Sequence, residues 1–171
     1  PVISHFDNKF ELPPVKDLKE KITNKTRAIL ICNPSNPTGY LYTEIEIKAL
    51  VDLAVEKDIF IIVDEVYREF IYTDSSHYSV LQNKKGSQHA VMIDSVSKRY
   101  SLCGARVGCM ISKNKRLMAT ALKFAHLRLS PPALALMASE AAITAPHSYL
   151  EKIKKEYSIR RKVTIEALEK I

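Results

Sequence analysis

Short runs of apolar, largely β-branched residues recur along this chain and constrain its fold more than any other feature. Each run is nearly continuous in apolar character, as is typical of strands buried on both faces of a sheet. The sequence predicts four such strands, at residues 28–32, 59–63, 90–93 and 107–111, with residues 2–3 as a candidate for a fifth.

A helix between the first two predicted strands indicates the type of sheet. Thr43 is followed by Glu46 in the pattern of a capping box, which marks the start of a helix. The apolar residues that follow lie on one helical face, which can cover the sheet: Ile47, Leu50, Val51 and Ala54. A strand, a helix and a second buried strand form a βαβ unit, so the sequence predicts an α/β fold with a mainly parallel sheet.

The chain becomes helical after the last predicted strand. Pro131 and Pro132 can start a helix over residues 133–142. A longer, charged helix follows, and we expect Ser148 to cap it, with Glu151 three residues further on.

The helix-like run at the end of the chain predicts how the domains are organised. We expect residues 1–146 to form part of a large domain, and residues 147–171 to form a long helix that leads toward a small domain outside this chain. The chain begins at Pro1 and reaches Ile171 without a glycine or proline stop signal, so we expect a piece of a longer enzyme.

The composition is that of a globular protein and excludes several classes. The 171 residues, 46% hydrophobic and 26% charged, are enough for one domain with a substantial core. No stretch approaches the roughly 18 uninterrupted apolar residues of a membrane span, and no signal peptide opens the chain. The three cysteines form no Cys-x-x-Cys pair and the five histidines have no metal-ligand spacing. We therefore expect no metal site and a cytoplasmic, reducing environment.

The net charge of +7 comes largely from basic clusters at residues 84–85, 113–116 and 152–162. Such clusters can bind nucleic acid or other anions. The chain has no zinc-finger or helix-turn-helix signature and no aromatic residues between Gly-rich basic runs. We therefore expect solvated helix faces, with no nucleic-acid or membrane partner. A non-catalytic module that binds anionic partners through residues 152–162 is the alternative from another functional class.

The first of three polar motifs follows the strand at residues 28–32 and reads Asn-Pro-Ser-Asn-Pro-Thr-Gly over residues 33–39. Its prolines fix φ and bias the preceding asparagines away from helix, and Gly39 permits a tight turn. Alone, this pattern is as typical of a rigid strand-to-helix turn as of a binding site. In a binding site, Asn36 would be held at the edge of the sheet where open α/β sheets bind ligands.

The second motif, Val-Asp-Glu-Val-Tyr, ends the strand at residues 59–63. An acidic residue at a strand end is often simply solvated. Here Asp64 and Tyr67 would share one sheet edge with Asn36 and Lys98. A buried carboxylate needs a cationic partner to stay ionised, and a protonated pyridine nitrogen can supply one.

The third motif combines hydroxyls, one amine and a glycine-flanked guanidinium: Ser95, Ser97, Lys98 and Arg106, with Gly104 and Gly108. Hydroxyls and a guanidinium can hold a phosphate dianion. An amine beside a bound phosphate can form an imine with a phosphorylated aldehyde, because lysine is the side chain that forms imines.

The same segment also matches Ser-x-x-Lys, the nucleophile motif of penicillin-binding proteins and related serine enzymes. In those proteins the motif opens a helix and is accompanied by Ser-Asp-Asn and Lys-Thr-Gly. This chain contains neither tripeptide, and Lys98 is predicted to follow a strand. We therefore set this alternative aside.

Taken in this order, the three motifs resemble those of the class I and II pyridoxal-phosphate aminotransferases of fold type I, and most of all their aspartate aminotransferase-like members. The resemblance extends over essentially the whole chain. It implies a three-layer α/β sandwich with a mixed sheet, the large domain of such a transferase, incomplete at both ends. Residues 107–111 would then be the antiparallel strand.

The resemblance also implies a role for each residue of the site. Lys98 would form the internal aldimine with pyridoxal 5′-phosphate and then move a proton between the substrate Cα and the cofactor C4′. Asp64 would keep the pyridine nitrogen protonated, so that the ring acts as an electron sink. Tyr67 and Asn36 would hydrogen-bond the 3-hydroxyl oxygen of the cofactor.

The phosphate would be held by Ser95, Ser97 and Arg106, with Gly104 and Gly108 letting the backbone bring Arg106 in. The family's phosphate-binding turn, its ring-stacking aromatic residue and its arginine for the substrate carboxylate have no match here. We expect these parts outside the chain, which would leave the chain on its own with an incomplete active site.

The implied activity is transamination between an amino acid, aspartate-like, and a 2-oxo acid, in an enzyme that forms a homodimer. A pyridoxal-phosphate lyase or synthase of the same fold is the alternative within the family, because the same motifs serve elimination chemistry.

Overall fold

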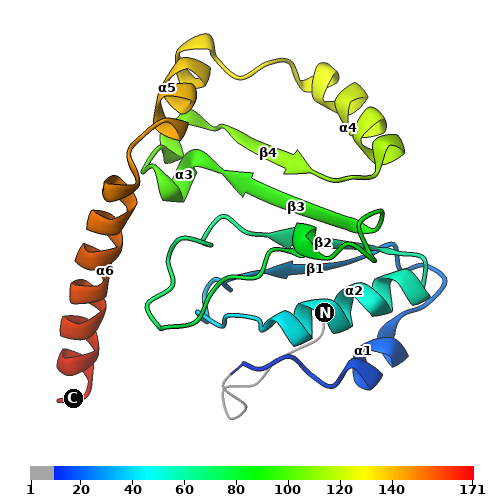
Figure 1. The fold of residues 1–171 in the computed structure, drawn as a ribbon, viewed down its shortest axis with the longest axis horizontal. Helices are drawn as coiled ribbons and strands as arrows, with labels where there is room; N and C mark the ends of the chain where they lie inside the picture. The colour runs from blue at the N-terminus through cyan, green and yellow to red at the C-terminus, as the bar shows by residue number, and fades with distance from the viewer. Residues whose placement is uncertain (1–9) are drawn as a thin grey trace.

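The computed structural model describes residues 10–171 (Figure 1). The strand predicted at residues 2–3 lies outside the described residues. Among those described, four strands form one sheet in the order of the chain: β1 (Ala28–Cys32), β2 (Phe60–Asp64), β3 (Ala90–Ser95) and β4 (Gly108–Ile111).

The sheet is mixed, as predicted. β1, β2 and β3 are parallel, and β4 is antiparallel to β3. The register places Cys32 of β1 beside Asp64 of β2, and Asp64 beside Ile93 of β3. The carboxyl ends of the three parallel strands therefore meet at one edge, where the polar motifs follow.

Helix α2 (Glu44–Glu56) covers one face of the sheet. Its capping box is present: Thr43 Oγ1 accepts from the backbone N–H of Glu46 at 3.2 Å, and Glu46 Oε2 accepts from the N–H of Thr43 at 2.7 Å. α1 (Val15–Lys21) packs beside α2. The predicted apolar face of α2 is buried in the main core and consists of Ile47, Leu50, Val51 and Ala54. The same core contains Ile61 and Val63 of β2, and Val80.

The opposite face of the sheet is less well covered in the described part of the chain. Leu30 of β1 pairs with Ile62 of β2, so both point away from the face that α2 covers. Leu30 is 72% exposed. The α/β fold with a mixed sheet is confirmed, whereas the described residues leave the second helical layer open over β1.

The helices after the sheet follow the sequence with one correction. α4 (Lys115–Arg128) comes after β4, and α5 (Ala133–Ile143) begins after Pro132 as predicted. The last helix, α6 (His147–Leu168), begins after Pro146 and not after Ser148. The prediction that Ser148 caps it is wrong, because the fixed φ of Pro146 already suits the residue before a helix and Ser148 falls in the first turn.

Helix α6 stands on the side of the molecule toward which β1, β2 and β3 point (Figure 1). None of the helices in residues 10–171 combines the length and the apolar character that crossing a bilayer requires. The division into residues 1–146 and 147–171 stays a prediction.

Candidate functional site

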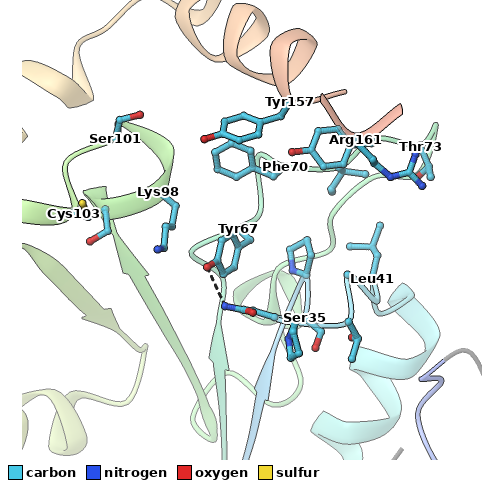
Figure 2. A pocket seen from close by; sticks show the side chains of 18 residues that line it. Ser35, Leu41, Tyr67, Phe70, Thr73, Lys98, Ser101, Cys103, Tyr157 and Arg161 are labelled. Atoms are coloured by element: carbon cyan, nitrogen blue, oxygen red, sulfur yellow. Dashed lines mark hydrogen bonds between the residues drawn. The ribbon is translucent and has the colours of Figure 1, made fainter. Parts of the chain in front are cut away.

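The carboxyl ends of the parallel strands border a cavity of about 740 Å³. Four of the predicted site residues line it, from three separate segments: Asn36, Tyr67, and Ser97 with Lys98. Its other wall comes from residues 70–73 and from Tyr157 and Arg161 of α6 (Figure 2).

Asn36 is presented by a tight turn after β1. The N–H of Gly39 donates to the carbonyl of Ser35, and the N–H of Ser35 donates to the carbonyl of Tyr40, both at 2.8 Å. Gly39 has φ of +72°, which is strained for residues with a side chain. The turn leaves Asn36 exposed, with its Nδ2 donating to Tyr67 Oη at 3.1 Å (Figure 2).

Tyr67 lies on the turn that ends β2. The N–H of Arg68 donates to the carbonyl of Glu65 at 3.0 Å, and the N–H of Phe70 donates to the carbonyl of Tyr67 at 2.8 Å. Asp64 precedes this turn, and its Oδ1 accepts from the N–H of Val66 at 3.0 Å. Within residues 10–171, Asp64 makes no ion pair.

Asp64 borders a second cavity, which runs along β1 and shares Ser35 and Asn36 with the first. The predicted residues are thus not all in one cavity. Asn36 connects the two cavities, because it belongs to the wall of both.

Lys98 is exposed, and its Nζ lies 5.9 Å from the centroid of the Tyr67 ring. In the described residues, its ammonium has no carboxylate partner within ion-pair distance. Lys98 belongs to α3 (Val96–Arg99), a single helical turn that Ser95 caps at the end of β3. Lys98 thus comes after a strand, as expected, but the segment from Ser95 to Lys98 also opens a helical turn. The argument against a serine enzyme rests on the two missing tripeptides and not on the helix.

Ser95 and Ser97 form a short chain of hydrogen bonds. Ser97 Oγ lies 2.7 Å from Ser95 Oγ, which also accepts from the N–H of Ser97 and lies 2.9 Å from the carbonyl of Val107. Because Ser95 has one hydroxyl proton, it donates to Val107 while Ser97 donates to it. Only Ser97 reaches the wall of the cavity with Lys98.

Arg106 lies on the segment that returns beside Ser95, since Ser95 pairs with Gly108 across β3 and β4. A Cβ at Gly108 would lie 2.9 Å from the carbonyl oxygen of Asp94, so this close approach requires glycine. A Cβ at Gly104 would meet nothing within 4 Å, so the predicted need for glycine there is not supported. The guanidinium of Arg106 is exposed and donates to the carbonyl of Cys103 at 2.8 Å, outside the wall of the cavity.

Sequence reasoning missed the far wall of the cavity. The rings of Phe70 and Tyr157 meet edge to face with their centroids 5.9 Å apart, which ties α6 to the loop after β2. Arg161 follows one helical turn after Tyr157 and lines the same wall. No local pattern reveals this wall, because its two halves are distant in the chain.

A buried ionic cluster behind the third motif was also missed. Asp94 of β3, 8% exposed, lies 3.0 Å from Nη1 of Arg68 and 3.0 Å from Nη2 of Arg99. Arg99 is the neighbour of Lys98 in α3, so this cluster anchors the helical turn that carries Lys98. No three His, Cys, Asp or Glu side chains in residues 10–171 gather in a way that could hold a metal ion.

Comparisons with known proteins identify the family of the chain. The sequence profile of the family described as aminotransferase class I and II matches residues 6–171. The aspartate aminotransferase of Bacillus subtilis is 35% identical over 155 residues, which are 90% of this chain and 39% of that protein.

Solved structures share the fold. A Thermus thermophilus aspartate aminotransferase mutant complexed with tryptophan superposes with a TM-score of 0.88 at 26% identity, over 98% of this chain and 44% of its own. A PLP-bound protein from Clostridium difficile shares the fold with a TM-score of 0.81 at 21% identity, over 92% of this chain and 41% of its own. This chain thus spans about two fifths of the length of these proteins.

Proposed function

Because the chain belongs to the aminotransferase class I and II family, we propose that it carries the cofactor-binding part of a pyridoxal-phosphate-dependent aminotransferase. The proposed reaction moves the amino group of an amino acid, aspartate-like, to a 2-oxo acid. The observation that supports it most is that Asn36, Tyr67 and Lys98 meet at one cavity from three separate segments.

The side chains at this edge of the sheet fit the chemistry of pyridoxal phosphate. Within residues 10–171 the site offers an amine without a carboxylate partner, Lys98, and a carboxylate without a cationic partner, Asp64. When bound, pyridoxal phosphate supplies an aldehyde that condenses with amines and a protonated ring that accepts electrons. An amine and a carboxylate left free are the two groups that such a cofactor would use.

Lys98 is the residue that we assign to the covalent attachment and to the proton transfer. Its Nζ is exposed at the cavity, where it can reach an aldehyde and later take a proton from the Cα of a bound amino acid. The Tyr67 ring lies beside it, with its centroid 5.9 Å from Nζ.

Asp64 would hold a proton on the pyridine nitrogen through its negative charge. Tyr67 and Asn36 would bind the ring oxygen of the cofactor. Because Asn36 Nδ2 donates to Tyr67 Oη, the hydroxyl proton of Tyr67 is left to donate to another acceptor.

The phosphate would be bound by Ser95, Ser97 and Arg106. The two hydroxyls are already close together, at 2.7 Å. The Arg106 guanidinium would have to exchange the carbonyl of Cys103 for a phosphate oxygen, and it is free to do so because it is exposed.

The aspartate-like substrate and the homodimer rest on the names and the nature of the relatives, of which this chain covers about two fifths. Both therefore remain proposals for the whole protein. A pyridoxal-phosphate lyase would use the same Lys98, and the products of the reaction distinguish it.

The test is to incubate the purified protein with pyridoxal phosphate, reduce it with borohydride and map the labelled peptide. We expect the label on Lys98 and none on Lys162, an exposed lysine of α6 that serves as the control. The Lys98→Arg variant keeps the charge and should take no label. A wild-type protein without label at Lys98 would contradict the proposed function, and release of ammonia without amino-group transfer to a labelled 2-oxo acid would favour a lyase.

A further inference from the structure

A buried carboxyl group lies directly behind the cofactor site that we propose. Glu65 follows Asp64 in the chain and is fully buried. Its Oε1 accepts from Ser79 Oγ at 3.0 Å and from the N–H of Val80 at 2.9 Å. Its Oε2 is buried and has no hydrogen-bond partner.

A buried imidazole faces the unpaired oxygen of Glu65. Nε2 of His77 lies 3.8 Å from Glu65 Oε2, and it is also buried without a hydrogen-bond partner. The side chain of His77 is only 10% exposed. Two buried polar atoms that face each other without other partners are each costly, unless a proton joins them.

The position of the proton on the neutral imidazole decides which of the two groups can donate across this contact. Nε2 is the ring nitrogen that is buried without a partner, whereas Nδ1 is not among the buried polar atoms that lack one, so we assign the proton of the neutral ring to Nδ1. With its proton on Nδ1, the neutral imidazole offers the lone pair of Nε2 to Glu65. A protonated Glu65 can therefore donate to Nε2 after a small rotation that shortens the 3.8 Å contact.

The surroundings favour this neutral arrangement. Burial raises the pKa of Glu65 and lowers the pKa of His77, so both groups lean toward their uncharged forms. The charged groups that face the pair are Arg68 and Glu69 on the turn after β2 and Asp94 on β3. Arg68 is already paired with Asp94 at 3.0 Å and lies 3.6 Å from Glu69, so these charges largely balance one another.

The pair lies where three segments meet. Glu65 belongs to the turn that carries Tyr67, and Asn33 begins the turn that carries Asn36. His77 lies near the end of residues 69–79, a segment we call the wall loop because its residues 70–73 form part of the cavity wall. The N–H of Asn33 donates to the carbonyl of Asp64 at 2.9 Å, so the two turns are already joined at the sheet.

We propose that Glu65 and His77 are positioning residues of the site. One proton shared between Glu65 Oε2 and His77 Nε2 ties the wall loop to the turns that carry Asn36 and Tyr67. When the pair loses this proton, a carboxylate faces the lone pair of an imidazole, two acceptors repel, and the wall loop is released. The link to the cofactor rests on the proposed function, whereas the contact itself does not.

The first experiment needs no variant and no cofactor. The ¹⁵N shifts of the His77 imidazole, measured by NMR near neutral pH, should be those of a neutral ring with its proton on Nδ1 and an accepted hydrogen bond at Nε2. An imidazolium, or a ring with its own proton on Nε2, would overturn the proposal.

The second experiment measures hydrogen exchange of the wall loop as a function of pH. In His77→Ala the exchange rate of the wall-loop amides, divided by their intrinsic rate at the same pH, should rise about tenfold at neutral pH. This is the factor expected for one buried hydrogen bond. Glu65→Gln should keep the protection, because its amide oxygen still accepts from Ser79 and Val80 while its NH₂ donates to His77. Glu65→Gln should also lack the loss of protection at alkaline pH that we expect of the wild type. The matched control is His147→Ala, whose side chain is 81% exposed, and it should behave as the wild type.

The third measurement connects the pair to the site. In protein loaded with pyridoxal phosphate, the pH midpoint of the visible absorbance should move upward in His77→Ala, because a loosened Asn36–Tyr67 pair stabilises the ring oxygen less. Glu65→Gln should restore the wild-type midpoint. If exchange and midpoint are unchanged in His77→Ala, or if Glu65→Gln is as impaired as His77→Ala, the shared proton is refuted. If Lys98 takes no label, the proposed function fails while the NMR and exchange results still decide the contact.

Discussion

Asn36 and Tyr67 are 31 positions apart in the chain, yet the side-chain amide of the first donates to the hydroxyl of the second at 3.1 Å. This bond joins the turn after β1 to the turn after β2. Both residues belong to the wall of the cavity that Lys98 shares. The two side chains should therefore act as one unit when the cofactor binds.

Tyr67→Phe removes the acceptor of this bond and the donor that we assign to the cofactor. We expect each of Tyr67→Phe and Asn36→Ala to weaken the binding of pyridoxal phosphate by about 0.5–1.5 kcal/mol, roughly 2- to 10-fold. The double variant should lose less than the sum, because the residues share a bond. Absorbance titration with pyridoxal phosphate measures all four dissociation constants, and strict additivity would contradict the coupling.

The capping box of α2 should make the stability of the protein depend on acid. Burial alone would raise the pKa of Glu46, but hydrogen bonds from Tyr40 and Thr43 outweigh it and leave that pKa below its usual value. A carboxyl group with a lowered pKa in the folded state stabilises the fold above its unfolded pKa, and this stabilisation is lost as the pH falls through the folded value.

We therefore expect the free energy of unfolding to fall below about pH 4.5, the ordinary value for glutamate, and Glu46→Gln to flatten this dependence. At neutral pH, Glu46→Gln should cost no more than about 1 kcal/mol, since the amide oxygen can still accept from Thr43. Urea unfolding of both proteins between pH 3 and pH 7 tests this. Parallel curves would show that Glu46 does not carry the acid dependence.

Removal of Asp94 should be far more costly than removal of a surface carboxylate. Asp94→Ala removes the closer carboxylate of Arg68 and Arg99 and leaves them only Glu69, 3.6 Å from each, so we expect a loss of about 3–5 kcal/mol. Glu44→Ala breaks the exposed bridge to Lys48 and should cost about 0.5 kcal/mol or less. Urea unfolding compares the two. If Asp94→Ala does not fold, Asp94→Asn, which keeps an acceptor, gives the measurable intermediate loss.

The cysteines should differ in their reactivity toward iodoacetamide. Burial raises the pKa of the Cys32 thiol, which also donates to the carbonyl of Pro34 at 3.2 Å. Cys103 is exposed and lines the cavity beside Lys98. At pH 8 we expect Cys103 to be alkylated about tenfold faster than Cys32, because the thiolate is the reactive form.

Bound pyridoxal phosphate should slow the alkylation of Cys103 and leave nearly unchanged that of Cys109, which is exposed and lines neither cavity. Peptide mass spectrometry as a function of time measures both rates. Equal protection of Cys103 and Cys109 would indicate a general change in the protein and not an occupied cavity.

Local patterns in the sequence predicted the elements of this fold because each pattern has a local cause. The capping box of Thr43 and Glu46 lies within four residues, and the apolar runs that form the strands are continuous. Ser148 shows the limit of this reasoning, since Pro146 starts the helix two residues earlier through its fixed φ.

The site could be predicted only where polar residues directly follow strands. Parallel strands bring their carboxyl ends together, which is why Asn36, Tyr67 and Lys98 could be grouped from the sequence. The contact between Phe70 and Tyr157 could not be predicted, because it depends on where α6 docks. Neither could the pairing of Glu65 with His77, since the path of the wall loop brings them together and no spacing rule does.

The four strands of residues 10–171 stand in the sheet in the same order as in the chain. Among these four, each new strand can therefore join the edge of the strands already made as the polypeptide leaves the ribosome, and none has to be inserted between two of the others. The first parallel pair is complete once Asp64 has been made, well before Lys98 and Arg106 are synthesised. The first parallel strands are thus in place before Lys98 is made, and an early arrest of synthesis would leave a β-sheet core without the amine that we assign to the cofactor.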